Sequence, residues 1–155
     1  MLQQTTEQVL ISLRPNLLDA FLSGEKCVEL RRRAPKLQSG TLVWFYAKVP
    51  YGRVMAVAKL RDVTVETTAA IWEAYQACMG ISKAEFDAYV SDIDTAAVMS
   101  FDTISPVAHP PGLQELRALE PGFQPPQFFR RMRPSKLLDR LSDSNPLASL
   151  PGCQH

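Results

Sequence analysis

Residues 23–33 read Ser-Gly-Glu-Lys-Cys-Val-Glu-Leu-Arg-Arg-Arg, and they hold the side chains best suited to chemistry in this sequence. The Ser-Gly pair predicts a turn, and the run after Lys26 alternates apolar and charged residues as a half-buried strand does. Successive side chains of a strand point to opposite faces, so Glu29 and Arg31 share one face and Arg32 points to the other. We expect Lys26, at the turn, to reach the face of Glu29 and Arg31.

A lysine, a carboxylate and an arginine on one short element can perform two kinds of chemistry. Arginine makes paired hydrogen bonds to phosphate, so the group can bind an anion. Burial favours the neutral amine of a lysine, so Lys26 can also act as a general base while Glu29 shuttles protons. The simpler alternative is an exposed ion pair, which stabilises a protein by about 0–1 kcal/mol. The residues alone leave these roles open.

The elements that must position these residues are short and of mixed type. Strands are expected at 9–13, 26–32, 42–47, 53–65 (bent or bulged), 96–101 and, as an edge strand, within 125–132; helices are expected at 16–22, 67–79, from 82 onward, 113–119 and 135–141. No regular alternation of strand and helix is present. The pattern therefore favours the α+β class, with about five to six strands in a small mixed β-barrel and short flanking helices.

The chain of 155 residues is long enough to form one domain with its own core. We expect a flexible N-terminus at 1–7, the domain at 8–132, and a basic short helix followed by a disordered tail at 133–155. The tail is expected to begin at Ser142, where Ser, Asp, Asn and Pro become frequent.

Tyr46 and Gln127 are two further candidates for ligand binding. Trp44, Phe45 and Tyr46 offer aromatic faces on which a base can stack. Tyr46 is the best of the three, because its hydroxyl makes full burial less favourable. Gln127, with the arginines that follow it, is a candidate for the open end of the barrel.

The net charge of +1 conceals two basic segments. Five of the 17 Lys and Arg residues fall in 26–36 and five more in 130–140. This distribution indicates an anionic partner at a local site rather than a basic surface that coats nucleic acid. Segment 130–140 is equally well interpreted as a solvated surface or as a contact for a protein partner.

Cysteine and histidine are too few and too widely spaced for a metal site. The three cysteines include no C-x-x-C pair, and only two histidines are present. We therefore expect no metal, no cofactor and no disulfide framework. No signal segment or apolar run of membrane-spanning length is found, so we expect a cytoplasmic protein without membrane association.

Three sequence blocks resemble an ASCH domain over about residues 8–132. They are S-G-E-K-x-V-E-x-R-R-R, G-T-L-V-W-F-Y-A and G-I-S-K-A-E-F-D-A-Y. ASCH domains belong to the PUA-like superfamily of small β-barrels and are described as RNA-binding, with links to translation and transcription. The resemblance places Lys26, Glu29 and Arg31, with Arg32 adjacent, in a cleft between the first helix and the barrel.

The resemblance implies a basic cleft that binds RNA, a nucleotide or a modified nucleoside. The alternative is a small hydrolase, either an amidohydrolase acting on a modified nucleoside or a ribonuclease, with Lys26 and Glu29 as catalytic residues. The amidohydrolase branch of the family has a threonine where this chain has Glu29. A third interpretation is a regulatory module that binds a protein partner through 130–140.

Overall fold

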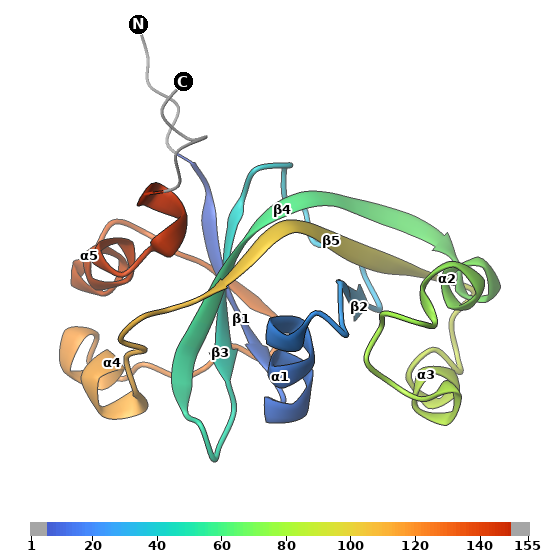
Figure 1. The fold of residues 1–155 in the computed structure, drawn as a ribbon, viewed down its shortest axis with the longest axis horizontal. Coiled ribbons are helices and arrows are strands. Elements are labelled where there is room, and N and C mark those ends of the chain that lie inside the picture. The colour runs from blue at the N-terminus through green and yellow to red at the C-terminus, as the bar shows by residue number, and fades with distance from the viewer. Residues whose placement is uncertain (1–5, 150–155) are drawn as a thin grey trace, which may run out of the picture.

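The computed structural model describes residues 6–149. Most of the expected N-terminal segment (residues 1–5) and the last part of the expected tail (residues 150–155) lie outside the described residues. Within them, six strands form one curled sheet (Figure 1). The strands are β1 (Gln8–Leu13), β2 (Val28–Arg31), β3 (Leu42–Ala47), β4 (Arg53–Thr67), β5 (Thr95–Pro106) and β6 (Phe129–Arg131), in the sheet order β2-β5-β4-β3-β1-β6.

Neighbouring strands are antiparallel except β1 and β3, which are parallel. The sheet curls into a half-barrel and leaves β2 and β6 as its two edges. The described helices are α1 (Pro15–Ser23), α2 (Thr68–Tyr75), α3 (Lys83–Tyr89), α4 (Leu113–Leu119), α5 (Lys136–Asp143) and a final 3-10 helix (Pro146–Ser149). The predicted α+β class and small mixed barrel with flanking helices are confirmed.

The two faces of the sheet are covered by different helices. Helix α1 packs inside the curl, where the rings of Phe21, Phe45 and Phe101 lie with centroids 5.3–5.6 Å apart. Helices α4 and α5 cover the opposite face, where Trp44 and Tyr46 are buried. Each face of β3 therefore packs against its own apolar cluster, which is why the strand is apolar throughout.

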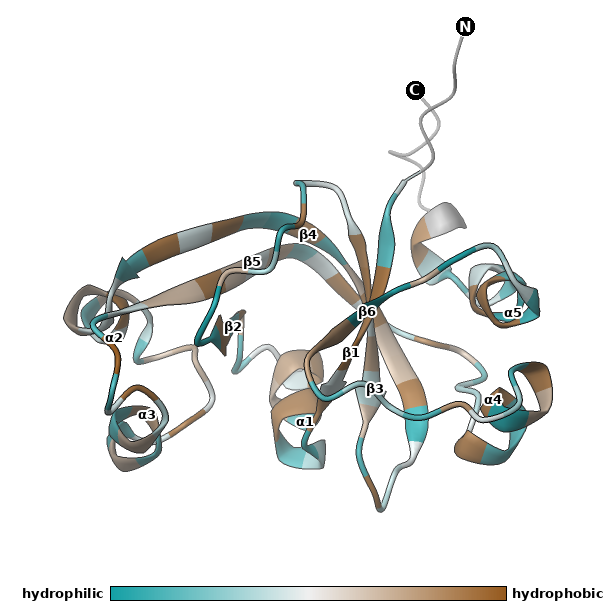
Figure 2. Cartoon of the chain, turned by 180° about the vertical axis from the view of Figure 1, so that it is seen from behind, coloured by the Kyte–Doolittle hydropathy of each residue, from teal (hydrophilic) through white to brown (hydrophobic). Residues whose placement is uncertain are grey.

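The long strands β4 and β5 extend beyond β3 as a curved ribbon, with β2 paired to β5 along it and α2 and α3 at its far end (Figure 1). The register between them shifts on both sides of Leu60, so the predicted bulge is confirmed. Figure 2 shows hydrophilic and hydrophobic bands alternating along this ribbon. The predicted capping box also begins α3: the Ser82 hydroxyl accepts from the Glu85 amide, and the Glu85 carboxylate accepts from the Ser82 amide.

The C-terminal elements complete the domain. Strand β6 pairs antiparallel with β1 at the edge of the sheet, as the sequence predicts for 125–132. Helix α5 continues through Asp143, and the 3-10 helix after it contains the buried residue Leu147. Ordered structure therefore extends past Ser142, where the sequence favours the start of a disordered tail.

Candidate functional site

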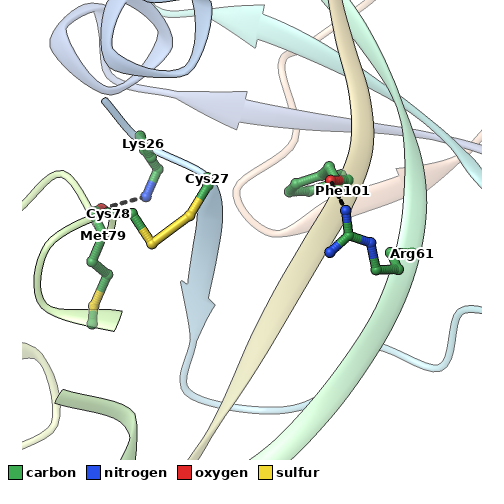
Figure 3. Close-up of a disulfide and its surroundings, with 6 residues drawn as sticks. All are labelled: Lys26, Cys27, Arg61, Cys78, Met79 and Phe101. Atoms are coloured by element: carbon green, nitrogen blue, oxygen red, sulfur yellow. Dashed lines mark hydrogen bonds between the residues drawn. A yellow bond between two sulfur atoms is a disulfide. The ribbon is translucent and has the colours of Figure 1, made fainter. Parts of the chain in front are cut away.

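Lys26 follows a short turn at the end of α1. Gly24 ends the helix with a φ of 87°, and its amide donates to the Phe21 carbonyl. The Lys26 amide donates to the Ala20 carbonyl at 2.9 Å, which fixes the backbone just before β2. The side chain then enters the interior and is only 3% exposed. Its Nζ donates to the Met79 carbonyl at 2.6 Å (Figure 3). The same Nζ lies 4.9 Å from the ring centroid of Phe21.

Lys26, Glu29 and Arg31 form one charged cluster. Glu29 is 6% exposed, with its Oε1 3.3 Å from Lys26 Nζ and its Oε2 2.9 Å from Arg31 Nη2. Val28 and Leu30 point the other way and pack with residues of α2 and α3, so the predicted division of the strand into two faces is confirmed. With Lys26 protonated, the cluster holds two positive charges and one negative charge. The excess positive charge suits an anion.

Burial is the main influence on the protonation of Lys26. It lowers the pKa of the amine below the usual 10.5, and the nearby positive charge of Arg31 acts in the same direction. The Glu29 carboxylate opposes this effect. Burial thus brings the neutral amine closer to physiological pH, as a general base requires, and an anion bound beside Lys26 would restore its proton.

A disulfide joins Cys27 to Cys78, with their Cα atoms 5.4 Å apart (Figure 3). The sequence predicts no disulfide framework, and this single bond is a pairing that it did not anticipate. The bond links the start of β2 to the loop between α2 and α3, and the Cys27 amide also donates to the Cys78 carbonyl at 2.8 Å. Residues 51 positions apart give no local signal of such a pairing. The link holds Met79, the hydrogen-bond acceptor for Lys26, against the cluster.

Gly80 is a site residue that sequence reasoning did not identify. Its φ of 79° lies in the left-handed region, and a Cβ at this position would lie 3.1 Å from Cδ of Lys26. Glycine is therefore needed both for the backbone conformation and for the space that Lys26 occupies. The sequence marks Gly80 only as the end of a helix.

A cleft of about 660 Å³ lies between the two edges of the curled sheet. One side is formed by Arg31 and the loop that follows β2, and the other by β1 and by residues at β6. The lining residues are Ile11, Arg31, Arg32, Arg33, Ala34, Pro35, Leu37, Tyr89, Met99, Phe128 and Phe129. Arg31 thus belongs both to the cluster and to the cleft.

Lys26 itself borders a second, smaller hollow of about 360 Å³ between the end of α1 and β5. Ser23, Gly24 and Asp102 are among the residues that line it. The cluster therefore lies between two surface depressions, and Arg31 connects it to the larger one. The resemblance places a cleft beside the first helix, and of the four residues expected in it only Lys26 lines this smaller hollow.

The remaining candidates lie apart from the cluster. Arg32 pairs with Asp92 through two hydrogen bonds of 2.7 and 3.0 Å and donates to the Tyr89 carbonyl at 2.7 Å. Its side chain thus joins the end of β2 to α3 at the rim of the cleft. Gln127 is exposed and directly precedes Phe128 of the cleft lining.

Tyr46 lies on the face of the sheet opposite the cluster. It is 2% exposed and packs near Phe123 under α4, and burial raises the pKa of its hydroxyl. The strand alternation places Trp44 and Tyr46 together, but only the packing of α4 and α5 decides that this face is covered. The structure therefore separates Tyr46 from the other candidates, and it is not a ligand residue of this cleft.

Between residues 6 and 149, no group of three or more His, Cys, Asp or Glu side chains is arranged to hold a metal ion. In the same part of the chain, no helix has the length and apolar composition needed to cross a membrane.

The curled sheet, with a charged cluster at the turn into β2, defines a PUA-like domain of the α+β class. The model of the ASCH domain family matches residues 11–105, which is more than half of the chain. The chain therefore belongs to the ASCH domain family.

Relatives in this family share most of the chain. It is 28% identical over 127 residues to an ASCH domain-containing ribonuclease of Zymomonas mobilis, a match covering 82% of this chain and 85% of the relative. The crystal structure of ASCH from Zymomonas mobilis matches with a TM-score of 0.81 and 27% identity, covering 87% of this chain and 94% of that one. A hypothetical protein from Leishmania major, at 12% identity and a TM-score of 0.55 over 90% of this chain and 95% of its own, shares the fold alone.

Proposed function

We propose that this protein binds RNA in the cleft between the two edges of its sheet, with Arg31 as the principal phosphate contact. The observation that carries the proposal is the buried cluster in which Lys26 and Arg31 share the single carboxylate of Glu29. A phosphate group beside Arg31 would balance the remaining positive charge. The similarity to a protein named a ribonuclease supports RNA as the source of that phosphate.

The distribution of charge around the cleft supports the same conclusion. Arg33 lines the cleft, is exposed, and makes no hydrogen bond or ion pair with the residues described between 6 and 149. Arg32, by contrast, is already paired with Asp92. Arg33 is therefore unpaired at the cleft, and Arg31 reaches the cleft while it keeps its ion pair with Glu29, so these two arginines are the ones we propose for contact with a phosphate backbone.

The proposal is tested by fluorescence anisotropy with a labelled single-stranded RNA of about twelve nucleotides, measured at several salt concentrations. We expect Arg31→Ala to weaken binding about tenfold and to reduce the slope of log affinity against log salt by roughly one phosphate contact. Lys48→Ala is the matched control, because Lys48 is exposed on the β3–β4 turn away from the cleft. Absence of RNA binding, or an unchanged affinity and salt slope in Arg31→Ala, would contradict the proposal.

RNA cleavage is the second candidate function. It is favoured by the position of Lys26 at the smaller hollow beside α1 and by its lowered pKa, since a neutral amine there can accept the proton of a ribose 2′-hydroxyl. The 2′-oxygen would then attack the adjacent phosphorus, and the bond to the 5′-oxygen would break as that oxygen gains a proton. Lys26 would be the base and Glu29 its proton-transfer partner.

A gel assay of labelled RNA separates cleavage from binding. Lys26→Arg keeps a positive charge but has no accessible neutral form. If Lys26 is the base, this variant loses cleavage and retains most of its affinity for RNA. If the wild type does not cleave a broad set of RNAs, or if Lys26→Arg cleaves as fast as the wild type, Lys26 is not a catalytic base here.

Three finer expectations remain proposals. The ligand class extends to nucleotides and modified nucleosides, whose phosphate or polar base the cleft can also hold. We also propose a cytoplasmic location. There, cellular thiols would reach the exposed Cys27 and reduce its disulfide with Cys78. A protein partner at 130–140 would contact Arg133 and Lys136, which are exposed. The other three basic residues of this segment are already in ion pairs: Arg130 with Glu120, Arg131 with Glu7 and Arg140 with Glu115.

A further inference from the structure

We propose that the cleft accepts one unpaired nucleotide whose base stacks on Phe128 while its phosphate lies at Arg31 and Arg33, so that the protein prefers single-stranded to duplex RNA. This inference rests on the proposed RNA binding and specifies the form of the ligand. It is carried by the division of the cleft into a cationic side and an aromatic side.

Exposed aromatic side chains line this cleft, with Phe128 beside β6 and Tyr89 beside Arg32 on the opposite rim. Phe128 is 74% exposed and makes no ring contact with another aromatic residue of the described chain. Tyr89, at the end of α3, is 39% exposed and lines the same cleft. Of the three exposed aromatic residues in the described chain, only Tyr51 lies elsewhere, where its hydroxyl donates to Asp19. Exposed rings gathered at a cleft indicate a surface for a flat apolar group.

The cationic side lies across the cleft from Phe128. Arg31 ends β2 and is followed by Arg32 and Arg33, whereas Phe128 directly precedes β6 and Phe129 begins it. A ligand in the cleft thus meets guanidinium groups on one side and a phenyl ring on the other. A nucleotide has this same division between an anionic phosphate and a flat base, and bases stack on aromatic side chains regardless of their identity.

The width of the cleft is set by bonds between its two sides. Arg131 of β6 donates to the Lys36 carbonyl at 2.7 Å, and its guanidinium lies 5.3 Å from the ring centroid of Phe129. Arg32 fixes the opposite rim through Asp92 and the Tyr89 carbonyl. A volume of about 660 Å³ lies in the usual range for small-molecule sites. In a duplex the base faces are stacked inside the helix, so they cannot reach Phe128.

The inference is tested with a single-stranded RNA and a duplex of the same length, by anisotropy with Phe128→Ala, Phe128→Trp and Arg31→Ala. We expect Phe128→Ala to weaken single-strand binding about 5- to 100-fold, without a change in the salt slope. Phe128→Trp should keep the affinity, and its added fluorescence should be quenched on binding. Val49→Ala is the matched control, because Val49 is 76% exposed on the β3–β4 turn.

The outcomes separate this inference from the proposed function. If Phe128→Ala binds as the wild type does while Arg31→Ala is weakened, base stacking is refuted and RNA binding stands. Equal or tighter binding of the duplex also refutes the inference. If neither variant changes the affinity, the cleft is not the RNA site and both proposals fail. Because Phe128 is exposed, its replacement is not expected to disturb folding.

Discussion

Reduction of the disulfide between Cys27 and Cys78 should destabilise the protein measurably. The bond closes a loop with a sequence separation of 51. In the chain-entropy model, opening such a loop costs about 4 kcal/mol of unfolding free energy at 25 °C. For a domain of this size, about 4 kcal/mol corresponds to a decrease in Tm of roughly 8–16 °C. Compactness of the unfolded chain would reduce this value.

Thermal unfolding followed by circular dichroism, with and without a phosphine reductant, measures the effect. A Cys153→Ser background removes the third thiol, which lies outside the described residues. The further double replacement Cys27→Ser and Cys78→Ser should reproduce the reduced Tm and be insensitive to reductant. Alkylation and mass spectrometry establish that the bond is present before reduction. Oxidised and reduced proteins with Tm values within about 2 °C would refute the reasoning.

Three further predictions concern residues around the charged cluster and the helix that follows it. Gly80→Ala should cost about 1 kcal/mol or more in a urea titration, because of its positive φ and the approach to Lys26, and an unchanged midpoint would contradict this. The folded-state pKa of Lys26 is lowered, so the unfolded state binds more protons between that pKa and 10.5, and stability should rise with pH across this window. Subtracting the profile of Lys26→Met isolates this rise, and a flat difference would show that the pKa is not lowered. Ser82→Ala, which removes the capping hydroxyl from α3, should cost about 1 kcal/mol, whereas Ser23→Ala, at the end of α1, should have a smaller effect.

Local patterns were sufficient to predict much of the fold. The apolar and aromatic run at 42–47 coincides with β3, and alternation at 28–31 correctly separates Glu29 from Val28 and Leu30. Strand β5, however, extends to Pro106 beyond the predicted 96–101. Its last residues are mostly polar and join the strand by pairing with β4, which no local pattern reveals.

The parts of the site that the sequence did not predict all depend on distant segments. Cys27 meets Cys78 because the loop between α2 and α3 folds back onto the start of β2. The face on which Tyr46 is buried is decided by α4 and α5, about seventy residues or more further along the chain. The cleft likewise joins the end of β2 to Phe128, which requires the whole curl of the sheet. The sequence therefore predicted which charged side chains lie together better than it predicted the cleft and the buried faces around them.

The edge position of β6 has a consequence for the protein during its synthesis. Strand β6 has three residues and is the last to join the sheet in chain order, yet Phe129 and its neighbour Phe128 form one side of the cleft. The match to the ASCH family model ends at residue 105, before this strand begins. A nascent chain that has emerged from the ribosome only as far as β5 would display the charged cluster with one side of the cleft missing. The cleft becomes complete only after nearly the entire domain has been translated.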